Sequence, residues 1–147
     1  MSLSDKLTPD LKTAMLAKDE AALRGLRAIK AALILLRTEK GVEPTEEEEL
    51  KMLQKLVKQR KESLEIYKTQ GREDLAKTEQ EEVTVIEKYL PSQLSEDEIR
   101  TQLKQIIEQT GAKTAAETGK VMGAASKHFA GKADNKTVAA LVKELLA

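Results

Sequence analysis

The segment YLPSQLSEDEIRTQLKQIIEQTG, residues 89–111, decides how this chain is divided. Pro91 ends a helix, because a proline ring cannot continue the backbone hydrogen-bond ladder. Ser95 and Glu98 have the spacing of a capping box, in which two side chains satisfy free N–H groups at a helix start. Apolar residues then repeat with helical spacing up to Gly111, at Ile99, Leu103, Ile106 and Ile107. The segment therefore predicts a break between two helical units.

The residues before this break are expected to form an N-terminal helical domain, residues 1–90. Apolar positions recur at i, i+3 and i+4, which is typical of amphipathic helices. Four helices are predicted, at about residues 4–18, 20–40, 46–70 and 73–90. An alternative start for the first helix is Thr8 as N-cap, with Pro9 at the first helical position.

The residues after the break are expected to form a small C-terminal three-helix domain, residues 95–147. Its helices are predicted at about 96–110 and 114–129, with a third after the turn at 131–134, where Asp134 is the expected N-cap. No stretch alternates apolar and polar residues as a strand does. The predicted fold is therefore all-α, a four-helix unit followed by a three-helix unit.

The composition excludes several classes of site. The chain has no cysteine and a single histidine, so disulfides, zinc clusters and thiol nucleophiles are excluded, and no metal or cofactor is expected. The aromatic residues are Tyr67, Tyr89 and Phe129, too few for the stacking platforms of common single-strand RNA binders. The longest apolar run, residues 31–36, is too short to span a membrane. With no leader-like start, we expect a cytoplasmic protein.

The charge is distributed unevenly, although the net charge is zero. From Gly111 onward there are six lysines and three acidic residues, a net charge of +3, and the first 110 residues carry −3. The six are Lys113, Lys120, Lys127, Lys132, Lys136 and Lys143.

Helical spacing places these lysines on outer faces. Lys113, Lys120 and Lys127 are seven residues apart and would form a stripe about 21 Å long on the sixth helix. Lys136 and Lys143 share the outer face of the last helix. The lysines are either a solvated face or contacts to the phosphates of a nucleic acid, which lysine binds as a point charge without reading base sequence.

Glycines accompany the lysines. Gly119 and Gly123 lie inside the sixth predicted helix, where glycine costs roughly 1 kcal/mol relative to alanine. Close packing against another helix would explain them, and so would close approach of a phosphate backbone. Gly131, in the last turn, is the third candidate for close approach.

No catalytic constellation is found. The GKVMG segment, residues 119–123, lacks the hydroxyl residue after the lysine that a phosphate-binding loop requires. Ser126 and His128 are two residues apart on a helix and point in different directions, so they are not a nucleophile and its base.

Four motifs carry a family resemblance. GREDLAKTEQEE (71–82), YLPSQLSEDEI (89–99), GKVMG (119–123) and GKADNKTVAALVKELL (131–146) occur in an order and spacing that resemble the YqeY family. That family is similar to the C-terminal helical and tail domains of one subunit of the aspartyl/glutamyl-tRNA amidotransferase, the subunit that activates the tRNA. The resemblance implies a tRNA-associated helical module, even where family labels speak of carbon–nitrogen ligase activity with glutamine as amido-N-donor. Lys120 and Lys132 match the tail motifs.

Two hypotheses of different classes follow. The first is a non-catalytic RNA-binding protein, with tRNA as partner, that uses the six lysines of the C-terminal unit. The second is a protein-interaction module, in which the helices of residues 1–90 dock a translation or amidotransferase protein.

Overall fold

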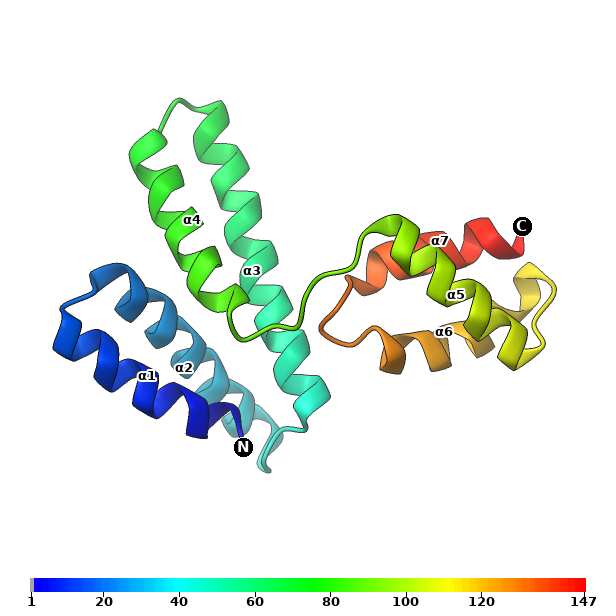
Figure 1. The fold of residues 1–147 in the computed structure, drawn as a ribbon, viewed down its shortest axis with the longest axis horizontal. Coiled ribbons are helices and arrows are strands. Elements are labelled where there is room, and N and C mark those ends of the chain that lie inside the picture. The colour runs from blue at the N-terminus through cyan, green and yellow to red at the C-terminus, as the bar shows by residue number, and fades with distance from the viewer. Residues whose placement is uncertain (1) are drawn as a thin grey trace. The chain divides into compact units, whose positions relative to one another are not determined.

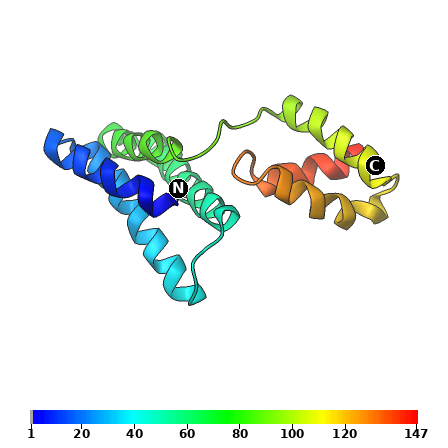
Figure 2. The same ribbon diagram turned by 60° about the horizontal axis from the view of Figure 1, so that its bottom comes forward.

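The chain is all-α, as expected. The computed structural model describes residues 2–147, and these contain seven α-helices, one short 3-10 helix and no strand. They divide into two compact units, one ending at Leu90 and the other spanning Pro91–Ala147 (Figure 1). Figure 2 shows the same helices after rotation. We call these the N-terminal unit and the C-terminal unit and describe each by itself.

The N-terminal unit consists of two helical hairpins. Its helices are α1 (Leu3–Ala17), α2 (Glu20–Lys40), α3 (Glu46–Thr69) and α4 (Glu73–Glu87). α1 packs on α2, α3 packs along α4, and α2 also packs on α4, which joins the two hairpins. α3 begins with a capping box, in which Thr45 and Glu48 bond to each other's backbone.

In the N-terminal unit, the helix boundaries differ from expectation at two places. α1 begins after Ser2, which forms a capping box with Asp5, and Pro9 lies inside the helix, so the alternative start at Thr8 is wrong. Because the helix already begins at Leu3, the N–H groups that follow Thr8 bond within the helix and need no cap. α4 ends at Glu87 rather than near Leu90, because the N–H groups of the next residues bond three residues back, in turn geometry.

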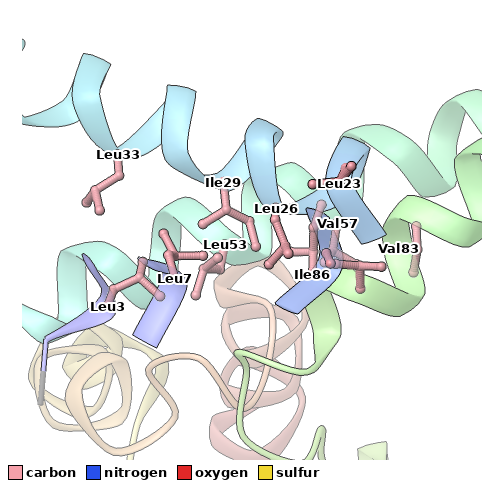
Figure 3. Close-up of a cluster of buried hydrophobic side chains, with 12 residues drawn as sticks. Leu3, Leu7, Leu23, Leu26, Ile29, Leu33, Leu53, Val57, Val83 and Ile86 are labelled. Carbon is pink, nitrogen blue, oxygen red and sulfur yellow. The ribbon is translucent and has the colours of Figure 1, made fainter. Parts of the chain in front are cut away.

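The core of the N-terminal unit is aliphatic. Figure 3 shows side chains of all four helices converging between them. Ile29, Leu53 and Ile86 are almost completely buried. α2 and α4 approach closely at Gly25, where a Cβ atom would lie 2.7 Å from the Cβ of Val85. Glycine is required at this crossing because any side chain would collide with α4.

The C-terminal unit contains α5 (Glu96–Thr110), the 3-10 helix η1 (Ala115–Glu117), α6 (Thr118–His128) and α7 (Asn135–Leu146). α5, α6 and α7 pack pairwise around a core of their own. The largest fully buried side chain is Phe129, which follows α6. Both predicted caps are present, the Ser95–Glu98 capping box on α5 and Asp134 on α7.

Candidate nucleic-acid interface

The core of the C-terminal unit determines which side of α6 faces outward. Val121 and Ala125 of α6 are fully buried against α5 and α7. Lys120 and Lys127 are exposed, and because they are seven residues apart they lie on one face about 10 Å from each other. The expectation that these two lysines lie on the outer face of a helix is confirmed.

Lys113 does not belong to this face. The predicted helix at 114–129 begins instead as the 3-10 helix η1, and α6 starts only at Thr118. Thr114 has an extended backbone, with φ −130°, and its side chain forms no cap. Lys113 therefore lies in the connection after α5, and the three-lysine stripe of about 21 Å is wrong. A helical wheel cannot be continued through a 3-10 turn, which has three residues per turn.

α7 presents the second lysine pair. Its N-cap Asp134 accepts a hydrogen bond from the backbone N–H of Lys136, at 3.2 Å. Val138 and Val142 are fully buried, whereas Lys136 and Lys143 are exposed. These two lysines are again seven residues apart and share the outer face of the helix.

Two contacts mark the sides of α7 and α6 that are turned toward α5. Glu144 of α7 binds Arg100 of α5 at 3.4 Å, and helical spacing places Lys136 and Lys143 about 80–100° farther round α7, away from α5. The His128 ring of α6 hydrogen-bonds to Gln102 of α5 at 2.7 Å.

The same spacing places Gly119 and Gly123 on the flank of α6 that is turned away from α5, toward α7. We call the exposed lysines and glycines of α6 and α7, taken together, the α6–α7 face. It consists of Gly119, Lys120, Gly123, Lys127, Lys136 and Lys143.

The two glycines of the α6–α7 face have no packing role. A Cβ atom at Gly119 or Gly123 would meet no atom within 4 Å, so the interpretation that these glycines permit close helix packing is wrong. Both residues are exposed. Their absent side chains leave the backbone of α6 uncovered between the lysines.

Gly131 and Lys132 are placed by the turn before α7. Gly131 is buried and has a φ of +76°, a left-handed conformation that favours glycine, so it has a conformational role of its own. The Gln93 side chain donates a hydrogen bond to the carbonyl of Gly131 at 2.7 Å. The N–H of Leu94 donates to the carbonyl of Lys132 at 3.0 Å. The backbone of Lys132 is thus held in place, and its side chain is exposed.

The ion pairs described in the C-terminal unit centre on Arg100. Within residues 2–147 no ion pair forms to any of the six predicted lysines, and Arg100 is occupied by Glu96, Asp97 and Glu144. The Glu144 carboxylate is the main cause of the raised pKa of Arg100. In the N-terminal unit, by contrast, several cations have carboxylate partners, including Arg24 with Glu81 at 2.6 Å.

One exposed lysine was missed by the sequence reasoning. Lys104 lies on α5, one residue after the fully buried Leu103, and borders the same surface hollow as Lys113. The signal was available, because Lys104 falls outside the apolar stripe of its helix. The prediction overlooked it because only residues after Gly111 were considered.

No group of three or more metal-binding side chains lies together within residues 2–147. None of the helices described there has the length and apolar character needed to cross a membrane.

Comparison with known proteins decides the family. The sequence model of the Yqey-like protein family matches residues 4–146. The chain belongs to the YqeY-like family. The structure brings two of its motifs together, since Gln93 and Leu94 of the YLPSQLS segment bind the turn formed by the GKAD segment.

Relatives of this YqeY-like chain occur in several fungi, where each is named altered inheritance of mitochondria protein 41, mitochondrial. The protein of Clavispora lusitaniae is 34% identical over 116 residues, 78% of this chain and 68% of the relative. The protein of Pyrenophora tritici-repentis is 32% identical over 149 residues, which cover 96% of this chain and 79% of the relative. The protein of Saccharomyces cerevisiae is 42% identical over 88 residues, which cover 57% of this chain and 46% of the relative.

These names correct the expected location. We predicted a cytoplasmic protein, whereas the relatives are named as mitochondrial proteins. The prediction was wrong because it relied on missing cysteines and a missing leader pattern. A chain without cysteine is compatible with any redox compartment, so its composition cannot identify one.

Proposed function

We propose that this YqeY-like protein binds RNA, with tRNA as its main partner, through the α6–α7 face. The observation that supports this most directly is that Lys120, Lys127, Lys136 and Lys143 are exposed and form no ion pair within residues 2–147. On α6 the lysines are accompanied by two exposed glycines with open space above them. Lysines of this kind attract phosphates without reading bases. The similarity of the family to the tail domain of the tRNA amidotransferase favours tRNA over other RNAs.

Lys132 extends the same positive surface. It is exposed in the turn between α6 and α7, and its backbone is held by hydrogen bonds to Phe129 and Leu94. A fixed backbone loses less conformational freedom when the side chain binds a ligand. The proposed activity is therefore non-catalytic recognition of RNA shape and backbone.

The experiment is binding of tRNA to the intact protein at several salt concentrations. In the test variant Lys120, Lys127, Lys136 and Lys143 are changed to alanine. The matched control changes four exposed lysines of the N-terminal unit to alanine, Lys12, Lys30, Lys55 and Lys77. Both variants have the same net charge, so they separate a local site from a general effect of charge.

We expect the test variant to lose most of its affinity, with the slope of log K against log salt concentration reduced by about 3. The control variant should retain a slope close to that of the unchanged protein. Equal losses in both variants, or no binding by the unchanged protein, would rule out the α6–α7 face as an RNA site.

A second variant tests the role of the glycines. Gly119→Ala and Gly123→Ala together should stabilise α6 by roughly 1–2 kcal/mol, because alanine is the better helix former and the added methyl groups meet no atoms. If a phosphate approaches this surface, the same variant should bind tRNA more weakly. A more stable variant with unchanged affinity would show that the phosphate does not contact the glycines.

The alternative function, docking of another protein, is favoured by one observation. Six large apolar side chains of the N-terminal unit are more than half exposed, at Met15, Leu16, Ile34, Leu35, Val42 and Ile66. Titration of labelled protein with purified tRNA amidotransferase tests this alternative. Complex formation that is weakened by Ile34→Ser together with Leu35→Ser, and unaffected by the four-lysine test variant, would support it.

A further inference from the structure

A surface hollow lies in the C-terminal unit, outside the α6–α7 face. It has a volume of about 490 Å³ and lies between the end of α5, the connection that follows it and the last turn of α7. Figure 1 shows these ends of α5 and α7 on the same side of the unit. We call it the α5–α7 hollow. Its lining consists of Lys104, Ile107, Glu108, Gly111, Ala112, Lys113 and Leu145.

The floor of the α5–α7 hollow is apolar. Ile107 and Leu145 are half-buried side chains at the edge of the core, and Ala112 is buried between them and the rest of the unit. Half-buried apolar side chains gain free energy when a ligand removes their remaining surface from water. The floor therefore favours a ligand with a flat, weakly hydrated body.

The rim of the hollow is charged. Lys104 and Lys113 come from different segments and are both exposed, and neither forms an ion pair within residues 2–147. Glu108 lies one turn after Lys104 on α5 and has no ion-pair partner there either. The rim therefore offers two cations to an anion and one carboxylate to a hydrogen-bond donor.

We propose that the α5–α7 hollow receives one unstacked nucleotide of a bound RNA. The base lies on Ile107 and Leu145, and the phosphate lies between Lys104 and Lys113. Sequence-specific RNA recognition generally targets bases that have left the stack, and here aliphatic side chains take the place of the aromatic ones on which such bases usually lie. The volume is in the range of pockets for small ligands, whereas an amphipathic peptide helix needs a groove with several anchor positions. This proposal rests on the proposed RNA-binding function.

Glu108 gives the site a preference among bases. A carboxylate accepts hydrogen bonds from exocyclic amino groups, which cytosine, adenine and guanine have and uracil lacks. The hollow should therefore prefer a cytidine nucleotide to a uridine nucleotide of the same size. This preference would be the only base discrimination by a protein that otherwise holds the RNA backbone.

The test is NMR titration of the intact protein, labelled at isoleucine and leucine methyl groups, with cytidine monophosphate, uridine monophosphate and inorganic phosphate. We expect cytidine monophosphate to shift the Ile107 and Leu145 methyl signals in a saturable way. Uridine monophosphate should bind about tenfold more weakly, and phosphate alone should leave the methyl signals unchanged. In Glu108→Gln the preference for cytidine should shrink, because an amide can also donate a hydrogen bond to uracil.

Two double variants separate this site from the proposed function. Lys104→Ala with Lys113→Ala should weaken binding of cytidine monophosphate, whereas Lys120→Ala with Lys127→Ala should leave it unchanged. If the protein binds tRNA but the nucleotides cause no methyl shifts, the proposed nucleotide site in the α5–α7 hollow is wrong. The proposed RNA site on the α6–α7 face is then unaffected. Nucleotide binding without tRNA binding would overturn the proposed function instead. Methyl shifts caused by an acidic peptide and not by nucleotides would show that the occupant is a protein segment.

Discussion

Two helical glycines have opposite surroundings. Gly25 of α2 lies at a helix crossing, where an added Cβ atom would be 2.7 Å from the Cβ and Cγ1 atoms of Val85. Gly123 of α6 faces open space. The two residues look alike in the sequence, because both interrupt an amphipathic pattern. Only the neighbouring helix gives one of them a packing role and leaves the other without one.

Gly25→Ala is expected to destabilise the protein by about 1–3 kcal/mol, since the methyl group forces α2 and α4 apart. Urea denaturation followed by helical circular dichroism would measure the loss. Val85→Ala should be less harmful in the Gly25→Ala background than alone, because it removes Cγ1, one of the two Val85 atoms 2.7 Å from the added Cβ, and leaves only the Cβ contact. Additive losses in the double variant would contradict this account.

Glu48 connects the start of α3 to the end of α2. Hydrogen bonds from the Lys40 ammonium, and then from the backbone of Thr45, lower the pKa of its carboxyl to about 2. Because the folded pKa lies below the ordinary value of 4.5, the contribution of Glu48 to stability is present above pH 4.5 and is lost as the pH falls toward 2.

Glu48→Gln should therefore reduce stability at neutral pH and have little effect near pH 2. Thermal unfolding of both proteins between pH 2 and pH 7 would show the two stabilities converging as the pH falls toward the folded pKa of about 2. A difference that stays constant over this range would mean that the carboxylate charge does not contribute.

At the scale of elements, the turn between α6 and α7 sets the position of both lysine pairs. Gly131 has a φ of +76°, and Gln93 and Leu94 bind the carbonyls of the turn. Gly131→Ala should destabilise the C-terminal unit by about 1–2 kcal/mol, because a Cβ atom is disfavoured in the left-handed region. Gly131→Asn should cost less, since asparagine tolerates this conformation.

Hydrogen exchange of the amides in α5, α6 and α7 would measure these changes. Equal effects of alanine and asparagine would indicate that burial of the added side chain, and not backbone conformation, determines the cost.

At the scale of the molecule, the two units have separate cores. No residue of the buried cluster formed by α1 to α4 is shared with the cluster formed by α5 to α7. Leu103→Ala, at a fully buried position of α5, should destabilise the C-terminal unit by about 2–5 kcal/mol. Hydrogen exchange should accelerate in α5 to α7, while the amides of α2 and α4 keep their protection. Faster exchange throughout the chain would show that the units unfold together.

The sequence by itself determined the helices and most of their ends. Periodicity, the capping boxes of α3 and α5 and the glycines at 41 and 111 act through neighbours in the chain, so their effect is visible without a tertiary structure. The same local rules placed all six lysines on the surface.

Only the tertiary structure decided how the lysines are grouped. Lys113 does not share a helix face with Lys120, because a 3-10 turn separates them. It lines the same surface hollow as Lys104, because α7 packs against α5. Gly25 contacts another helix because Val85, 60 positions further along the chain, packs against it. Gly123 faces empty space. Such contacts join segments that are distant along the chain, and local propensities carry no information about them because they describe only the nearest turns.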